Sequence, residues 1–330
     1  MNYRRLGNSG LKVSEVGLGS WLTYGSSTEA DISDRCIQFA FECGINFFDT
    51  ANGYARGAAE IAVGKTLSKF PRESFVLATK VFMGMGDGPN DHGLSRKHIF
   101  EQCHASLKRL GVDYIDLYQA HRFDADVPVE ETLLAFNDLV KQGKILYYGV
   151  SEWTGDQITD AVHRAEANRL RAITSNQPQY SLLARGIEKS VIPVCETAGI
   201  GQVVFSPLAQ GLLTGKYKAG QPAPAGSRAS DPRQNEFLKT GELDTYVHDR
   251  VRVDDALLVR IQGFVAIADE IGLSPSQMAL AWCLRQPNVA SVIIGASRPE
   301  QIQDNIGAAG VVLTSDVLNK IDAVLEYSPS

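Results

Sequence analysis

The stretch that decides the fold is residues 47–54, FFDTANGY, where an apolar run changes abruptly to polar residues. Phe47 and Phe48 are typical of a buried strand, whereas Asp49 follows directly and Tyr54 lies five residues further on. An unpaired carboxylate at the end of a buried strand is costly to desolvate. We therefore expect Asp49 to have a partner and to belong to a site.

Seven other β-rich runs separate longer segments of helical periodicity. Alternating strand and helix patterns indicate βα units around a parallel sheet, and eight such units match a (β/α)8 barrel. We therefore predict an α/β fold, a (β/α)8 TIM barrel, formed as a single domain over residues 1–330. The eight predicted strand runs are 16–21, 45–50, 74–81, 114–121, 145–151, 171–177, 201–207 and 290–297.

Several segments around these runs have recognisable patterns. Residues 3–13, YRRLGNSGLKV, predict an N-terminal β-hairpin that turns between Gly7 and Gly10 and closes the bottom of the barrel. Helices are predicted over 30–44, over 129–144, and between an N-cap at Ser95 and a terminating Gly111. The Gly-rich residues 81–95 and the Pro- and Gly-rich residues 218–237 form long loops, and the sequence leaves open whether they act as lids.

The composition limits the class of protein. A formal net charge of -6 gives no basic field for nucleic acid or anionic lipid. No apolar run approaches the ~20 residues of a membrane helix, and the first residues lack the apolar region of a secretory signal. The five cysteines form no CxxC pair, so we expect them to be reduced and predict no metal site. These features predict a cytoplasmic protein with a small-molecule partner, without membrane insertion or nucleic-acid binding.

Polar side chains lie where the predicted strands end. Asp49, Lys80 and His121 close three consecutive runs, and Tyr54 lies on the loop after the first of them. Taken singly, each has a structural explanation, such as a solvated strand tip or loop packing. Because the strands of a (β/α)8 barrel end at one face, we expect the four to converge. The pKa of a free phenol is near ~10, so a phenol needs a neighbouring cation to transfer protons at neutral pH. Lys80 can be that cation, and Asp49 can keep Lys80 protonated and oriented.

These residues resemble those of a known family. FFDTANGY (47–54), LATK (77–80) and DLYQAH (116–121) are similar to the Asp, Tyr, Lys and His tetrad of the aldo-keto reductase superfamily, which comprises NADPH-dependent (β/α)8 barrel enzymes. Within it the chain looks most similar to the branch that contains the potassium-channel β-subunits and their bacterial enzyme relatives. The resemblance extends through LGNSGLKVSEVGLGSW (6–21), GKILYYGVSEW (143–153), SPLAQGLLTGKY (206–217) and VIIGASRPEQIQDN (292–305).

The resemblance implies NADPH-dependent reduction of aldehydes or ketones to alcohols, the work of an oxidoreductase acting on CH–OH donors. It implies that Tyr54 is the general acid, that Lys80 and Asp49 lower its pKa, and that His121 orients the carbonyl group. The channel β-subunits typically carry Asn at the position of His121, so this His favours an active reductase.

The resemblance also implies an NADP(H) site. No GxGxxG motif follows a strand, so a Rossmann site is unsupported. Ser151, Asn176 and Gln177 are similar to the carboxamide contacts, and Tyr180 to the aromatic residue that stacks on the nicotinamide. Arg298 can make a bidentate contact with a phosphate, which favours NADP over NAD. The full implied set is Gly19, Ser20, Trp21, Asp49, Ser151, Asn176, Gln177, Tyr180, Ser206, Leu208, Gln210, Gly211, Lys216, Gly295, Ser297, Arg298, Gln301, Asp304 and Asn305.

Aromatic side chains near the predicted strand ends suggest a pocket for a small carbonyl substrate. The physiological substrate and the direction of the reaction are left open. Relatives in this branch include assemblies, so a homo-oligomer is also left open. The predicted substrate pocket consists of Trp21, Tyr24, Tyr54, Phe82, His121 and Trp153.

Two other functions remain open at this point. The first is an NADPH-binding regulatory subunit with slow turnover. Two features argue against it: the presence of His121, and the absence of a partner-binding tail, since the chain begins almost at the hairpin. The second is a Schiff-base enzyme with Lys80 as the nucleophile, which requires a neutral amine that Asp49 would oppose.

Overall fold

Eight parallel strands close into a barrel in the computed structural model, which describes residues 1–21, 24, 30–231, 242–243 and 251–326. Their order around the barrel is β12-β3-β4-β5-β6-β7-β8-β9. Every predicted run contains or overlaps one of these strands, so the predicted (β/α)8 TIM barrel is confirmed. The strands are β3 (Val16–Gly19), β4 (Phe47–Asp49), β5 (Val76–Val81), β6 (Ile115–Ala120), β7 (Ile145–Ser151), β8 (Ser175–Gln177), β9 (Gly201–Phe205) and β12 (Val289–Ile294).

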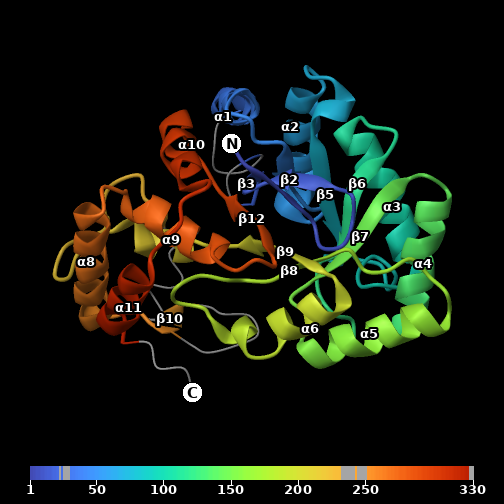
Figure 1. Cartoon of the computed structure of the whole chain (residues 1–330). Helices are drawn as coiled ribbons and strands as arrows, with labels where there is room; N and C mark the ends of the chain where they lie inside the picture. The colour runs from blue at the N-terminus through green and yellow to red at the C-terminus, as the bar shows by residue number, and fades with distance from the viewer. Residues whose placement is uncertain (22–23, 25–29, 232–241, 244–250, 327–330) are drawn as a thin grey trace.

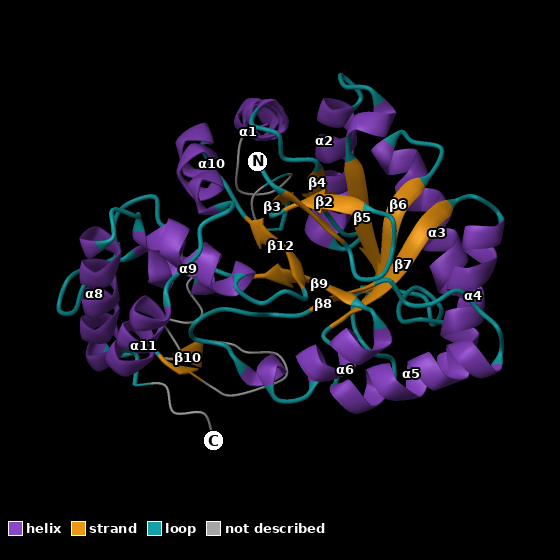
Figure 2. Ribbon diagram, viewed as in Figure 1, coloured by secondary structure: helices purple, strands orange, loops and turns teal. Residues whose placement is uncertain are grey.

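Helices surround the strands on the outside of the barrel, as Figure 1 and Figure 2 show. Six of them connect consecutive barrel strands, while α9 precedes β12 and α10 follows it. Two further helices, α8 and α11, pack against each other at one side of the molecule, on the left in Figure 1. The bounds are α1 (Ala30–Glu42), α2 (Ala58–Leu67), α3 (Arg96–Leu110), α4 (Val129–Lys141), α5 (Gly155–Ala167), α6 (Val191–Ala198), α8 (Asp255–Glu270), α9 (Pro275–Leu284), α10 (Pro299–Asn305) and α11 (Ser315–Val324).

Capping groups set the ends of α3 as the sequence predicted. The Ser95 hydroxyl accepts a hydrogen bond from the backbone N–H of His98, which satisfies one of the free donors of the first turn. Gly111 follows the last turn with φ of 67°, in the left-handed region that glycine adopts without strain. The strand-to-helix connections therefore follow from local sequence signals.

The N-terminal hairpin closes the bottom of the barrel. It consists of β1 (Tyr3–Arg5) and β2 (Lys12–Ser14), and its Leu6 and Val13 are fully buried in a cluster with inward residues such as Phe47 and Leu117. Its turn binds the chain just before β9, where Asn8 N donates to the Gly199 carbonyl at 2.8 Å. These contacts lie at the N-terminal ends of the strands, so the opposite end remains for a site.

Where the structure describes the chain between β9 and α8, that chain contains short elements. These are η4 (Ala209–Thr214), η5 (Arg228–Ser230), β10 (Glu242–Leu243) and β11 (Val251–Arg252). Of the long loop predicted at 218–237, residues 232–237 lie outside the described residues. In the parts of the chain that the structure describes, no helix has the length and apolar character needed to cross a membrane.

Candidate active site

A buried ion pair joins the ends of β4 and β5. Lys80 Nζ lies 2.6 Å from Asp49 Oδ2, and the Lys80 side chain is completely buried. The same ammonium donates to the Thr50 carbonyl at 2.8 Å, while Asp49 Oδ1 accepts from Gln177 Nε2 at 2.9 Å. Both oxygens of the carboxylate therefore have a donor, as a charge in a barrel interior requires. The partner expected for Asp49 is Lys80.

Tyr54 is held against this pair by an unusual turn of the backbone. Its hydroxyl lies 3.3 Å from Lys80 Nζ, and it begins η1 (Tyr54–Gly57). Ala55 and Arg56 follow with φ of 47° and 50°, a left-handed conformation that costs non-glycine residues about 1–3 kcal/mol each. Gly57 continues the left-handed turn with φ of 89°. The strained turn therefore positions the Tyr54 phenol next to the Lys80 ammonium.

A second buried ion pair joins α2, the helix that follows this turn, to α3. Glu60 of α2 is fully buried, and its Oε2 accepts from Arg109 Nε of α3 at 2.5 Å. Its other oxygen accepts from Thr79 Oγ1 at 2.6 Å, and Thr79 directly precedes Lys80 in β5. A Cβ at Gly57 would stand 2.7 Å from Arg109 Cδ, so the turn sits directly on this arginine. The elements that carry Tyr54 and Lys80 are therefore tied to each other.

His121 faces Tyr54 from the end of β6. The two rings meet edge to face with their centroids 5.6 Å apart, and the Trp21 ring lies 6.5 Å from Tyr54 on another side. Burial, together with the positive charges of Lys80 and Arg122, holds the pKa of His121 well below its usual 6.5. The imidazole is therefore neutral at neutral pH and can hydrogen bond to an uncharged oxygen.

The pKa of Tyr54 differs from the prediction. Lys80 lowers it, as predicted, but burial of the phenol is the largest effect and raises it, and the charge of Asp49 raises it further. The net pKa of Tyr54 lies above its usual 10.0, so the prediction of a lowered value was wrong in this structure. The consequence is a phenol that keeps its proton at neutral pH, which is the form that a general acid requires.

Lys80 itself stays protonated. Burial lowers its pKa, but attraction to Asp49 and Tyr54 and hydrogen bonds to both outweigh this effect, and the net pKa lies above the usual 10.5. The site therefore contains an ammonium, a carboxylate, a protonated phenol and a neutral imidazole.

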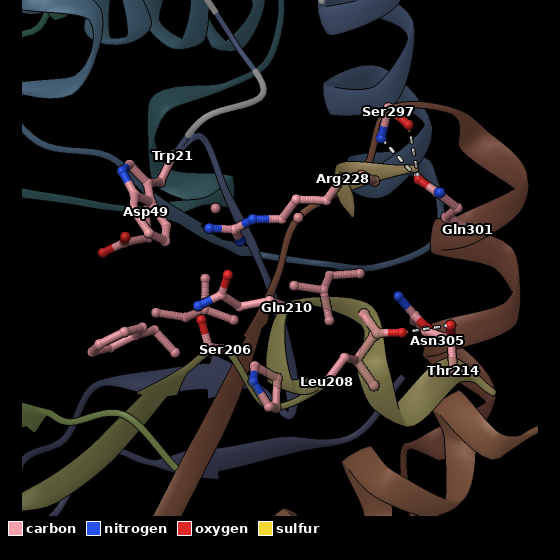
Figure 3. Close-up of a pocket in the computed structure, with 18 of the residues that line it drawn as sticks. Trp21, Asp49, Ser206, Leu208, Gln210, Thr214, Arg228, Ser297, Gln301 and Asn305 are labelled. Atoms are coloured by element: carbon pink, nitrogen blue, oxygen red, sulfur yellow. Dashed lines mark hydrogen bonds between the residues drawn. The ribbon is translucent and has the colours of Figure 1, made fainter. Parts of the chain in front are cut away.

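A cavity of about 860 Å3 extends from these residues to α10. Figure 3 shows Trp21 and Asp49 at one end and Ser297, Gln301 and Asn305 at the other, with Arg228 between them. Ligand sites for organic molecules have volumes of roughly 300–1,000 Å3, so this cavity can hold a large ligand. The predicted site residues that line it are Gly19, Trp21, Asp49, Tyr54, His121, Ser151, Gln177, Ser206, Leu208, Gln210, Gly211, Lys216, Gly295, Ser297, Gln301, Asp304 and Asn305.

Cations gather around the middle of the cavity. Lys216 and Arg228 line it, and the charges of Arg298 and Arg228 add to burial in lowering the pKa of Lys216. Arg298 is exposed at the start of α10 and is not among the lining residues, although its charge reaches Lys216. Pro299 occupies the first turn of this helix. Three neighbouring positive charges favour an anion.

Besides Arg298, three predicted cofactor residues are not among those that line the cavity. Ser20 is buried beside β4, where its backbone N–H donates to the Asp49 carbonyl. Asn176 points to the outer side of β8, because side chains alternate along a strand and Gln177 points inward, and it donates to Gln202 at 3.2 Å. Neither side chain lines the cavity, so a cofactor contact by these two residues stays a prediction.

The third of these residues, Tyr180, is completely buried. Its hydroxyl donates to Glu188 at 2.6 Å and accepts from Arg285 at 2.9 Å, and its ring packs on Trp282. The aromatic ring that lines the cavity in this region is Phe205, at the end of β9. Phe205 therefore replaces Tyr180 as the candidate stacking residue.

Three predicted substrate-pocket residues also lie elsewhere. Tyr24 is buried in the core against Cys36 of α1, and Trp153 is buried with its ring 4.9 Å from that of Phe123. Phe82 is partly buried against the hydrophobic core, while the next residue, Met83, lines the cavity. The end of the cavity beside Asp49 is therefore bounded by Trp21, Tyr54, His121 and the previously unassigned Gly53, Met83 and Arg122.

The sequence missed the part of the lining that comes from the long segment after β9. Gly226, Ser227, Arg228, Ser230 and Asp231 all face the cavity. The available signal was the long loop predicted at 218–237, whose role the sequence left open and which indicated no individual residue. Among the described residues, no group of three or more His, Cys, Asp or Glu side chains is arranged to hold a metal ion.

Comparison with known proteins agrees with the predicted fold and family. The closed barrel with a polar cluster at its strand ends defines the class of (β/α)8 barrel proteins with a site at the C-terminal face. The chain belongs to the aldo/keto reductase family, whose sequence profile matches residues 15–326. Membership of this family supports an oxidoreductase activity and binding of a nicotinamide cofactor.

Three relatives span nearly the whole chain. A protein of Schizosaccharomyces pombe named putative voltage-gated potassium channel subunit beta is 43% identical over 99% of this chain and 94% of its own length. Proteins named probable voltage-gated potassium channel subunit beta are 42% identical over 100% of this chain in Arabidopsis thaliana and in Oryza sativa subsp. japonica, each over 98% of the relative's length. The similarity to the channel β-subunit branch is therefore confirmed.

We predict that the Lys80–Asp49 pair behaves as a unit in folding. Lys80→Met should lower the free energy of unfolding by about 3–5 kcal/mol, because it leaves the buried Asp49 carboxylate without its counter-ion. The double variant Asp49→Asn, Lys80→Met should recover much of that loss. Urea unfolding measures both, with Lys97→Met of the exposed Lys97–Glu101 pair as a control that should cost under about 1 kcal/mol. A loss in Lys80→Met no larger than in the control would contradict the prediction.

Proposed function

We propose that this protein is an NADP(H)-dependent reductase that converts aldehydes and ketones to alcohols. The observation that carries the proposal is the buried cluster of Asp49, Lys80 and Tyr54, with the Tyr54 hydroxyl 3.3 Å from an ammonium and open to a large cavity. A protonated phenol beside a fixed cation is suited to giving a proton to an oxygen that becomes negative.

The lining of the cavity fits a phosphate-bearing dinucleotide. Lys216 and Arg228 offer positive charge in its middle, and a Cβ at Gly211 would stand 3.0 Å from Lys216 Nζ, so glycine leaves the ammonium uncovered. The far end offers the polar side chains of Ser297, Gln301 and Asn305. Phe205 offers a flat ring near the tetrad. We place the nicotinamide end beside Phe205, Ser151 and Gln177, and the adenosine end beside α10.

The bound cofactor would supply a hydride to the carbonyl carbon. Tyr54 then gives its phenolic proton to the carbonyl oxygen, so that hydride and proton together yield the alcohol. The Lys80 ammonium stabilises the phenolate that remains, and Asp49 keeps that ammonium in place. The N–H group of neutral His121 donates a hydrogen bond to the carbonyl oxygen and fixes its direction toward Tyr54.

The Schiff-base alternative is disfavoured by the charge on Lys80. A nucleophilic amine must be neutral, yet the carboxylate at 2.6 Å helps to keep the pKa of Lys80 above its usual value. Its nitrogen is also committed to Asp49, Thr50 and Tyr54.

A regulatory subunit that binds NADPH and turns over slowly is the second candidate function. The names of the three relatives favour it, since each is named as a channel subunit. His121, where the channel β-subunits typically carry Asn, favours the reductase. The names also support a place in an assembly, which light scattering of the purified protein would measure. We further propose a cytoplasmic location, supported by five unpaired cysteines that suit a reducing compartment.

We predict that Tyr54→Phe abolishes most turnover without affecting cofactor binding. Removing the proton donor should lower kcat/KM for 4-nitrobenzaldehyde by about 10²–10⁴-fold, while the Kd for NADPH stays within about threefold. The Kd comes from a fluorescence titration, and adding the aldehyde to the same sample gives the rate of NADPH oxidation. Wild-type binding without turnover would support the regulatory candidate, and unchanged turnover in Tyr54→Phe would remove the acid role.

We predict that Arg298 distinguishes the two nicotinamide cofactors. Arg298→Ala should weaken NADPH binding about 5- to 50-fold and leave NADH binding nearly unchanged, because a guanidinium makes charge-assisted hydrogen bonds to the additional phosphate. Titrations with both cofactors test this. Equal losses for NADPH and NADH would show that Arg298 does not bind that phosphate.

A further inference from the structure

The turn that carries Tyr54 is held by a side chain of α3, Arg109. Between Tyr54 and α2 the chain passes through three left-handed residues, Ala55, Arg56 and Gly57. Such a turn costs free energy and persists only when the surrounding structure holds it. Gly57 precedes α2 and has no side chain that could cap the helix. The position of the Tyr54 phenol therefore depends on what packs against this turn.

Arg109 packs directly against the turn. A Cβ at Gly57 would lie 2.7 Å from Arg109 Cδ and 2.9 Å from Arg109 Nε, so the arginine covers the glycine. Its Nη2 donates to Ser106 Oγ on the same helix at 3.1 Å, which fixes the guanidinium. Further along α2, a Cβ at Gly64 would overlap the backbone carbonyl of Leu110. The end of α3 therefore approaches both the turn and α2 closely.

Glu60 joins this arginine to the strand that carries Lys80. One oxygen of the completely buried carboxylate accepts from Arg109 Nε at 2.5 Å, and the other accepts from Thr79 Oγ1 at 2.6 Å. Side chains alternate along a strand, so Thr79 faces α2 while the next residue, Lys80, faces the barrel interior. The same carboxylate therefore fixes both β5 and, through Arg109, the turn after Tyr54.

Neither Arg109 nor Glu60 lines the cavity, so an effect of either on the reaction must act through other residues. The Tyr54 hydroxyl lies 3.3 Å from Lys80 Nζ, slightly more than in a typical hydrogen bond, so little further separation is tolerated. Misplacement of a reacting group by about 1 Å can lower a rate about 10²-fold. Without Arg109, Glu60 would be a buried charge with a single hydroxyl donor, and α2 would lose the contact that sets its distance from β5.

We propose that Arg109 is a positioning residue for the proton transfer. Through Glu60 and the left-handed turn it sets how closely the Tyr54 hydroxyl approaches the Lys80 ammonium. This inference rests on the proposed reductase function and extends its machinery to a side chain outside the cavity. Loss of Arg109 impairs the step in which Tyr54 gives up its proton, whereas cofactor binding remains because the cavity lining is unchanged.

The test is a double-mutant cycle that combines Arg109→Met with Tyr54→Phe. The rate of 4-nitrobenzaldehyde reduction by NADPH is measured for the wild type, both single variants and the double variant, in single turnovers with the enzyme in excess. Arg109→Met should lower the rate about 10- to 100-fold when Tyr54 is present. In the Tyr54→Phe background it should lower the rate by less than about threefold, because no phenol remains to be positioned. The Kd for NADPH should stay within about threefold in all four proteins.

Arg72→Met is the matched control. Arg72 lies 2.5 Å from Asp116, and their side chains are 23% and 8% exposed, against 18% and 0% for Arg109 and Glu60. Asp116 is near the start of β6, at the end of the barrel opposite the cavity. Arg72→Met therefore removes a comparable ion pair and should leave the rate of the folded protein nearly unchanged. A rate in Arg109→Met no lower than in this control would overturn the proposal.

Two milder substitutions apply the same test if Arg109→Met does not fold. Arg109→Lys keeps a cation beside Glu60, so it should lower the rate by only about 2- to 10-fold. Thr79→Val removes the hydroxyl that binds Glu60 to β5 and should also lower the rate only when Tyr54 is present. Equal losses in the two Tyr54 backgrounds would show that Arg109 does not act through the phenol. A wild type that binds NADPH but does not reduce the aldehyde would instead remove the proposed function and the positioning role with it.

Discussion

The structure of the site depends on one interaction, the buried contact between the Lys80 ammonium and the Asp49 carboxylate at 2.6 Å. Burial alone would drive both groups to neutrality. Together they remain charged, since each compensates the other and Gln177 and the Thr50 carbonyl supply the remaining hydrogen bonds. The pair joins the ends of two adjacent barrel strands, so the same contact that neutralises the charge also fixes the position from which Lys80 meets Tyr54.

The barrel supports the buried ion pair and the strained turn after Tyr54. The hairpin fills the N-terminal end with apolar side chains such as Leu6 and Val13, which leaves the C-terminal end for polar groups. Behind the site, the buried Glu60–Arg109 pair and the Thr79 hydrogen bond tie the left-handed turn after Tyr54 to β5. The strain at Ala55 and Arg56 is therefore held by packing that does not itself touch the cavity. Rigid strand ends carry Lys80 and His121, while the longer segment after β9 completes the lining.

The sequence predicted the barrel and the tetrad because both leave strong local signals. Asp49, Lys80 and His121 each interrupt an apolar run at its end, and strand ends meet at one face of a barrel. It failed where side-chain direction decides the outcome. In a three-residue strand such as β8, nothing local shows that Gln177 points inward and Asn176 outward. Tyr180, Tyr24 and Trp153 read as pocket aromatics but pack in the core, whereas Phe205 faces the cavity. The raised pKa of Tyr54 could not be predicted from the sequence either, since it depends on how deeply the phenol is buried.

The central claim is that Tyr54, supported by Lys80, is the proton donor for a carbonyl group. The most direct test is the pH dependence of kcat/KM for NADPH-dependent reduction of 4-nitrobenzaldehyde. A general acid acts in its protonated form, and the pKa of Tyr54 is raised above 10.0, so the rate should stay level from neutral pH and decline only above that value. A decline that is already under way below 6.5, on the side of the usual histidine pKa to which that of His121 is shifted, would assign proton donation to an imidazole and contradict the account.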